Sequence, residues 1–158
     1  MLKSIAMFLA CLIVTFAAAA LGSFATTPSI PTWYAALNKP FFNPPNWIFG
    51  PVWTLLYLMM AVAAYLIWQK GLNDPAVRTA LIVFLIQLAL NSLWSVVFFG
   101  WHALWLAYIV IILLWLAIIG TIVLFFPLVP LAAWLLVPYI LWVSFASFLN
   151  LAVALLNR

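Results

Sequence analysis

Five runs of apolar residues, each about twenty residues long or longer, dominate this chain of 158 residues. An α-helix rises about 1.5 Å per residue, so each run is long enough to cross the roughly 30 Å hydrocarbon layer of a membrane. Charged residues make up only 4% of the chain, far below the usage of soluble globular proteins. Because the alternating pattern of membrane strands does not occur, we predict an all-α membrane protein, a five-transmembrane-helix bundle. The helices are expected at residues 4–25, 46–69, 78–99, 103–126 and 131–156.

The first apolar run has two interpretations. Residues 3–25 resemble a secretory signal, because a lysine precedes an apolar core that ends in small residues. The apolar part is longer than most signal cores, so we expect a retained first helix in a single domain of residues 1–158. Five spans place the termini on opposite sides of a multi-pass membrane protein. Three of the five basic residues then share the side of the amino terminus, which favours a cytoplasmic amino terminus.

Few residues in the chain are suited to acid–base or metal chemistry. One aspartate, one histidine and one cysteine cannot form a carboxylate pair, a catalytic triad or a two-histidine metal site. We therefore predict no metal and no required cofactor. Asp74 precedes Pro75, the pattern of a helix N-cap followed by proline at the first helical position, so we assign the only acid a structural role. The five basic residues are too few and too scattered for a nucleic-acid partner.

Residues 38–47, NKPFFNPPNW, stand out between the first two apolar runs. Prolines restrict a loop that we expect over residues 26–45, which is too long for a simple turn. We predict that this Pro-rich aromatic loop folds over the mouth of the bundle as a lid; the alternative is an aromatic collar in the lipid headgroups. The residues expected at the lid and mouth are Trp33, Lys39, Phe41, Phe42, Trp47 and His102.

Polar and aromatic residues recur at helical spacing inside three of the spans. Gln87, Asn91 and Trp94 share one stripe of the third helix, because residues three and four apart lie on one face. Such stripes predict a ligand pocket with aromatic faces and amide groups between the helices. The alternative is that the amides of Gln87, Asn91 and Asn150 only join the helices to one another. The expected pocket residues are Trp53, Tyr57, Gln87, Asn91, Trp94, Trp142 and Ala146.

Three segments resemble the translocator protein (TspO/MBR) family, whose members are also called tryptophan-rich sensory proteins or peripheral benzodiazepine receptors. The segments are WYAALNKPFFNPPNWIFGPVWTLLY, QLALNSLWSVVFFG and VPYILWVSFASFLN, and the likeness covers nearly the whole chain. The resemblance, to bacterial-type members, implies a lipid bilayer of bacterial type and a bundle, commonly dimeric, that binds porphyrins such as protoporphyrin IX or haem-related tetrapyrroles. On this chain the family's cavity tryptophans are Trp53 and Trp142, its loop aromatic is Tyr34, and its polar third-helix residue is Asn91.

The resemblance also bears on two further properties, porphyrin breakdown and sterol binding. Some bacterial members are said to degrade porphyrins in light through the two cavity tryptophans, Trp53 and Trp142. The family's sterol motif requires a tyrosine where this chain has Leu151, so sterol binding through that motif is not expected.

We expect a receptor or sensor, and the alternative is a passive or facilitated transporter of tetrapyrroles or other small apolar solutes. A homodimer would use the small residues Ala89 and Ser92 of the third helix.

Overall fold

A computed structural model describes residues 2–158 as a bundle of α-helices. Within these residues, five helical segments are long and apolar enough to cross a membrane, so the predicted multi-pass architecture is confirmed. Two of the five spans end in a π-helical segment and one is broken into two helices. The elements are α1 (Leu2–Ser29), η1 (Ile30–Tyr34), α2 (Asn46–Trp68), α3 (Pro75–Ser95), η2 (Val96–Gly100), α4 (Leu104–Phe125), α5 (Pro130–Leu135) and α6 (Val137–Leu156).

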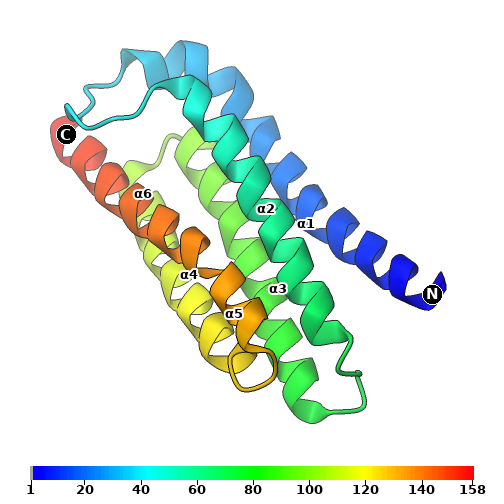
Figure 1. Cartoon of the computed structure of the whole chain (residues 1–158). Helices are drawn as coiled ribbons and strands as arrows, with labels where there is room; N and C mark the ends of the chain where they lie inside the picture. Colours follow the sequence, from blue (N-terminus) through cyan, green and yellow to red (C-terminus); the bar gives the residue numbers. More distant parts are fainter. Residues whose placement is uncertain (1) are drawn as a thin grey trace.

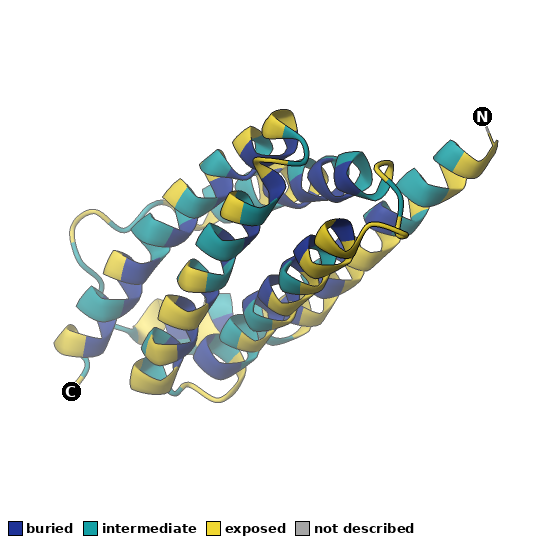
Figure 2. Cartoon of the chain, turned by 90° about the horizontal axis from the view of Figure 1, so that it is seen from below, coloured by how far each residue is buried: buried dark blue, intermediate teal, exposed yellow. Residues whose placement is uncertain are grey.

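The helices follow one another as an up-and-down bundle with the termini at opposite ends (Figure 1). α1 packs on α2 and α3, α3 packs on α4, and α4 packs on α6. The buried residues face the interior of the bundle and the exposed ones face outward, although both kinds are mostly apolar (Figure 2). An apolar exterior is what a helix bundle surrounded by lipid requires. The interior includes fully buried side chains of Met60, Ile67, Ile111 and Tyr139.

The first span is longer than predicted, and the expected loop is correspondingly shorter. α1 and η1 run to Tyr34 and helical structure continues to residue 36, so only residues 37–45 form the connection. Pro28 and Pro31, which we assigned to the loop, lie inside this helical span. Proline has a helix-compatible φ, and a wide π-helical segment accommodates a missing N–H where an α-helix would be interrupted. The prediction of a loop over residues 26–45 is therefore wrong in its first half.

The end of this first span is held by a side chain from the connection itself. The Lys39 ammonium donates to the carbonyl oxygens of Tyr34 (2.7 Å), Leu37 (3.0 Å) and Ala35 (3.2 Å). The carbonyls of Tyr34 and Ala35 belong to the last turn of a helix, where helical partners are lacking, and Leu37 follows that turn directly. The cation also favours this end of the helix dipole. Lys39 is thus a C-terminal cap.

Two other helix boundaries agree with the sequence pattern. The Asp74 carboxylate accepts a hydrogen bond of 2.8 Å from the backbone N–H of Ala76, which confirms its role as the N-cap of α3. The fifth span breaks at Leu136, and Pro138 stands in the first turn of α6. Because proline has no N–H, the helix cannot continue unbroken past this point. As a result α5 packs against α2, whereas α6 packs against α4.

Small residues bring α1 close to α3 and η2. The hydroxyl of Ser92 donates to the carbonyl of Ala18 at 2.9 Å, and Ser29 donates to the carbonyl of Phe99 at 2.6 Å. A Cβ on Gly22 would lie 3.0 Å from the hydroxyl oxygen of Ser95, so only glycine fits here without displacing a neighbour. Of the two small residues predicted for a homodimer, Ser92 is buried against α1 and Ala89 is exposed, so the homodimer stays a prediction.

Candidate functional site

A cavity of about 630 Å³ lies in the half of the bundle nearest the 37–45 connection. This volume falls within the roughly 300–1,000 Å³ that is usual for small-molecule sites. α1, α2, the α3–η2 span and α6 each form part of its wall. Aromatic residues supply much of the lining: Phe16, Tyr34, Trp47, Phe49, Trp53, Tyr57, Trp94, Phe98, Phe99 and Trp142.

Trp53 of α2 and Trp142 of α6 both line this cavity. The Trp53 ring lies 5.7 Å from the ring of Tyr57, and the Trp142 ring lies 6.1 Å from that of Phe49, measured between ring centroids. Within residues 2–158, neither indole N–H has a hydrogen-bond acceptor, whereas the N–H of Trp94 does. Two indoles with available donors therefore face the same aromatic space.

The cavity floor is a chain of buried hydrogen bonds that joins three helices. The Tyr57 hydroxyl donates to Oδ1 of Asn91 at 2.6 Å, and Nδ2 of Asn91 donates to the Tyr139 hydroxyl at 2.8 Å. The Tyr139 hydroxyl in turn donates to Oε1 of Gln87 at 2.8 Å. Tyr57 and Asn91 line the cavity, while Gln87 lies behind them and does not. The structure therefore places Gln87 among the interhelical contacts and Asn91 in both roles.

A second amide fixes the upper wall. Oδ1 of Asn150 accepts the indole N–H of Trp94 at 3.0 Å, and Nδ2 of Asn150 donates to the carbonyl of Leu104 at 3.0 Å. One side chain thus joins α3, α4 and α6. Trp94 and Ala146, both predicted for the pocket, line the cavity beside it. The small Ala146 side chain leaves room between the larger rings.

Only part of the predicted lid meets the cavity. Tyr34 and Trp47 line it, and the Tyr34 hydroxyl donates to Oδ1 of Asn43 at 2.6 Å, so the connection is fixed at the cavity roof. Phe41 is 100% exposed and Phe42 packs edge-on against Phe145 of α6, and neither reaches the cavity.

The remaining mouth residues serve the structure of the cavity rim. Trp33 stacks on His102 with ring centroids 4.1 Å apart, which ties η1 to the turn between η2 and α4. Lys39 has its three ammonium hydrogens engaged by carbonyls, so it has no free donor for a ligand carboxylate. Trp33, Lys39 and His102 do not line the cavity.

The carboxyl terminus also holds the connection. The backbone N–H of Asn38 donates to Oδ1 of Asn157 at 2.9 Å, and Nδ2 of Asn157 donates back to the carbonyl of Asn38 at 2.8 Å. This two-bond clasp joins residues 119 positions apart in the sequence. It places the 37–45 connection and the carboxyl terminus on the same side of the protein, as five spans require.

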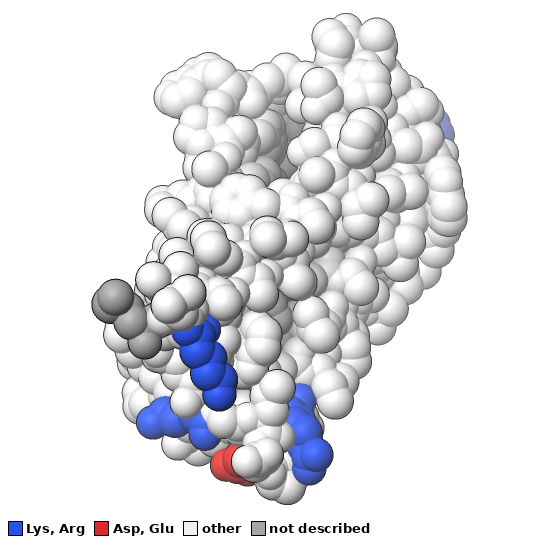
Figure 3. All heavy atoms as spheres, turned by 90° about the vertical axis from the view of Figure 1, so that its right-hand side faces the viewer, with Lys and Arg blue, Asp and Glu red and all other residues white. Residues whose placement is uncertain are grey.

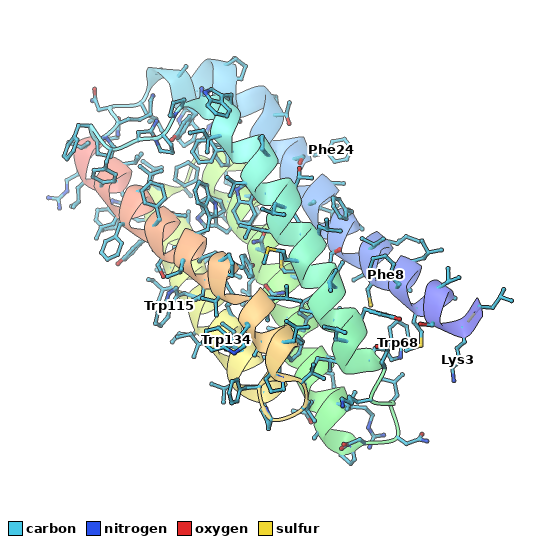
Figure 4. The ribbon with its side chains drawn as sticks, viewed as in Figure 1. Lys3, Phe8, Phe24, Trp68, Trp115 and Trp134 are labelled. Atoms are coloured by element: carbon cyan, nitrogen blue, oxygen red, sulfur yellow. The ribbon has the colours of Figure 1, made fainter. Side chains whose placement is uncertain are left out.

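The cavity opens sideways between α1 and α2. These helices meet near the amino terminus, where Phe8 packs edge-on against Tyr65 at 5.4 Å between ring centroids. Further along the chain, the small residues of α1 face α3. Ser23 of α1 and Thr54 of α2 line the cavity but are exposed, so the cavity reaches the surface between these two helices. A hollow is visible in the upper part of this face (Figure 3). Phe24, next to Ser23 on α1, points away from the bundle (Figure 4).

The α1 wall is the part of the site that the sequence analysis missed. Apart from Phe16, its lining residues are small or hydroxylated: Ala19, Ala20, Gly22, Ser23, Thr26 and Thr27. This stretch resembles the small-residue end of a signal sequence, and it contains no aromatic or amide stripe to mark it as a wall. The recurring hydroxyl groups near the end of an apolar run were the available signal.

Together these features define a class: an α-helical membrane protein that spans the bilayer five times around a tryptophan-lined cavity. The chain belongs to the TspO/MBR family, whose sequence model matches residues 10–156. It is 46% identical over 157 residues to the tryptophan-rich protein TspO of Archaeoglobus fulgidus, covering 99% of this chain and 97% of that relative.

Two further relatives show how widely this similarity extends. The tryptophan-rich sensory protein of Cereibacter sphaeroides is 40% identical over 149 residues, which cover 92% of this chain and 91% of the relative. The human translocator protein is 41% identical over 123 residues, covering 77% and 72% of the two chains. The family predicted from the three sequence segments is thereby confirmed.

Proposed function

We propose that this protein is a membrane receptor or sensor that binds a tetrapyrrole, such as protoporphyrin IX, in the cavity. The observation that carries the proposal is the pair of indoles, Trp53 and Trp142, which line one cavity and whose N–H groups make no hydrogen bond within residues 2–158. A flat macrocycle would stack on aromatic rings, and its polar atoms would accept hydrogen bonds from the indoles. The name of the Cereibacter sphaeroides relative, tryptophan-rich sensory protein, supports this class of function.

The floor of the cavity supports binding rather than passage through the bundle. Below the Tyr57–Asn91–Tyr139 hydrogen bonds, the side chains of Met60, Ala61 and Ile67 have no exposed surface. A close-packed interior of this kind leaves no continuous path for a macrocycle. A ligand would therefore enter and leave the cavity on the same side, through the mouth or the opening between α1 and α2.

Two measurements test the proposal. Titration of the detergent-solubilised protein with protoporphyrin IX in the dark should quench tryptophan fluorescence to saturation at one porphyrin per chain. Vesicles containing the protein should then bind the porphyrin without net uptake into the lumen. Quenching that rises without saturation would overturn the receptor, and protein-dependent uptake would instead support the transporter.

Light-driven breakdown of the porphyrin is a second candidate function. It is favoured because tryptophan is an easily oxidised side chain, and Trp53 and Trp142 of the cavity wall would both contact a bound macrocycle. Illumination of the saturated complex should then bleach the porphyrin absorbance faster than illumination of free porphyrin in the same detergent. Equal rates of bleaching would leave the protein as a receptor alone.

A further inference from the structure

A second, shallower hollow of about 400 Å³ lies on the outer face of the bundle between α2 and α6. α2 contributes Val52, Leu55 and Leu56, and α6 contributes Pro138, Leu141, Trp142 and Phe145. The break at Leu136 explains the hollow, because α5 stays against α2 while α6 leaves it to pack on α4. The outer groove is therefore built into the fold by Pro138 rather than left by a missing side chain.

The chemistry of the outer groove suits hydrocarbon only. Six of its seven lining side chains have no hydrogen-bonding group, the exception being the indole N–H of Trp142. The rim residues Leu55 and Leu141 are 57% and 64% exposed. Val52 lies six residues into α2, or about 9 Å from the loop-side end at 1.5 Å per residue. At this depth the groove faces the hydrocarbon layer and lies below the lipid headgroups. An acyl chain fits these properties, and a charged headgroup does not.

Trp142 separates the outer groove from the inner cavity. Its side chain lines both hollows, and the rings of Phe49 and Phe145 pack against it at 6.1 and 5.6 Å between centroids. We propose that the outer groove retains one acyl chain of a membrane phospholipid, which contacts the outer side of Trp142 while the cavity ligand contacts its inner side. The lipid site would make Trp142 a point of contact between the bilayer and the ligand cavity, and it does not depend on which ligand the cavity takes.

The test uses phospholipids brominated at the middle of one acyl chain, because bromine quenches indole fluorescence on contact. The protein is reconstituted in nanodiscs with increasing fractions of brominated phosphatidylcholine, with no porphyrin present. Subtracting the fluorescence of Trp142→Phe from that of the parent isolates the Trp142 signal, and Trp142→Tyr provides a second reference. We expect this signal to fall at least twofold, with half of the quenching reached well below an equal mixture of lipids.

A groove-filling variant and a matched control locate the contact. Leu55→Phe combined with Leu141→Phe narrows the rim of the outer groove, whereas Leu58→Phe combined with Leu113→Phe adds the same atoms at exposed positions that line neither hollow. The rim variant should lose most of the Trp142 quenching and the control should keep it. An unquenched Trp142 signal, quenching in simple proportion to the brominated fraction, or equal quenching in the rim variant would each overturn the lipid site.

Discussion

The hydroxyl of Tyr57 donates a hydrogen bond of 2.6 Å to the side-chain oxygen of Asn91, across the interface between α2 and α3. Both side chains are buried, and both line the cavity. The side-chain amide of Asn91 in turn donates a hydrogen bond to the hydroxyl of Tyr139 of α6. The same bonds that join three helices therefore shape the floor on which a ligand would rest.

Replacing Asn91 with alanine tests this floor. The change leaves the hydroxyls of Tyr57 and Tyr139 without their shared partner, and a buried polar group without a partner costs roughly 1–3 kcal/mol. We expect the free energy of unfolding, measured by titration with a denaturing detergent, to fall by about that amount. Tyr57→Phe removes one bond and keeps the other, so its effect should be smaller. An Asn91→Ala protein as stable as the parent would contradict the account.

Asn157→Ala tests the clasp on the 37–45 connection. The change removes both hydrogen bonds to Asn38, and a typical bond contributes about 1 kcal/mol, which corresponds to roughly a fivefold change in an opening equilibrium. Hydrogen exchange of the Asn38 amide should therefore become several-fold faster. Arg158→Ala, at the neighbouring position, is the control. Unchanged exchange at Asn38 would show that the clasp does not hold the connection.

Gly22 and Gly50 form a matched pair for the position of α1. A Cβ on Gly22 meets Ser95 at 3.0 Å, whereas a Cβ on Gly50 has no neighbour within 4 Å. Gly22→Leu should lower the free energy of unfolding by about 1–3 kcal/mol, the usual cost of overpacking. Gly50→Leu should leave stability close to that of the parent. Equal effects of the two changes would show that the contact between α1 and α3 is not close.

Lys39 provides a test of how the cavity mouth treats a charged ligand. Its ammonium is engaged by three backbone carbonyls at the end of the first span, so Lys39→Met should loosen this end without removing a partner of the porphyrin carboxylates. The affinities for protoporphyrin IX and for its dimethyl ester should then fall by the same factor. A larger loss for the free acid would show that Lys39 binds the carboxylates after all.

Much of the architecture follows from local rules that the sequence displays. The five spans follow from run length, the α3 start from the Asp74–Pro75 pair, and the break in the fifth span from Pro138. The cavity tryptophans and Asn91 were found from their helical spacing and from the family resemblance. These features depend on residues that are close together in the chain, so they can be predicted from a single sequence.

Other features depend on contacts between distant residues. Pro28 and Pro31 suggested a loop, but the end of the first span stays helical because Lys39 caps it and Ser29 bonds to Phe99. Gln87 shares the stripe of Asn91 but does not line the cavity, and it instead accepts a hydrogen bond from the buried Tyr139 hydroxyl of α6. The sequence alone does not reveal which residues of one helix face a neighbouring helix will cover.

The most direct test of the proposed site is the affinity for protoporphyrin IX of the double variant Trp53→Phe/Trp142→Phe. Phenylalanine keeps an aromatic ring but removes two N–H donors, and two hydrogen bonds of about 1 kcal/mol each correspond to tenfold or more in affinity. The control is Trp115→Phe/Trp134→Phe, two tryptophans that do not line the cavity. The dissociation constant, measured by porphyrin absorbance in the dark, should rise on the order of tenfold or more in the first variant and stay unchanged in the control. An unchanged dissociation constant in both variants would contradict the placement of the ligand between Trp53 and Trp142.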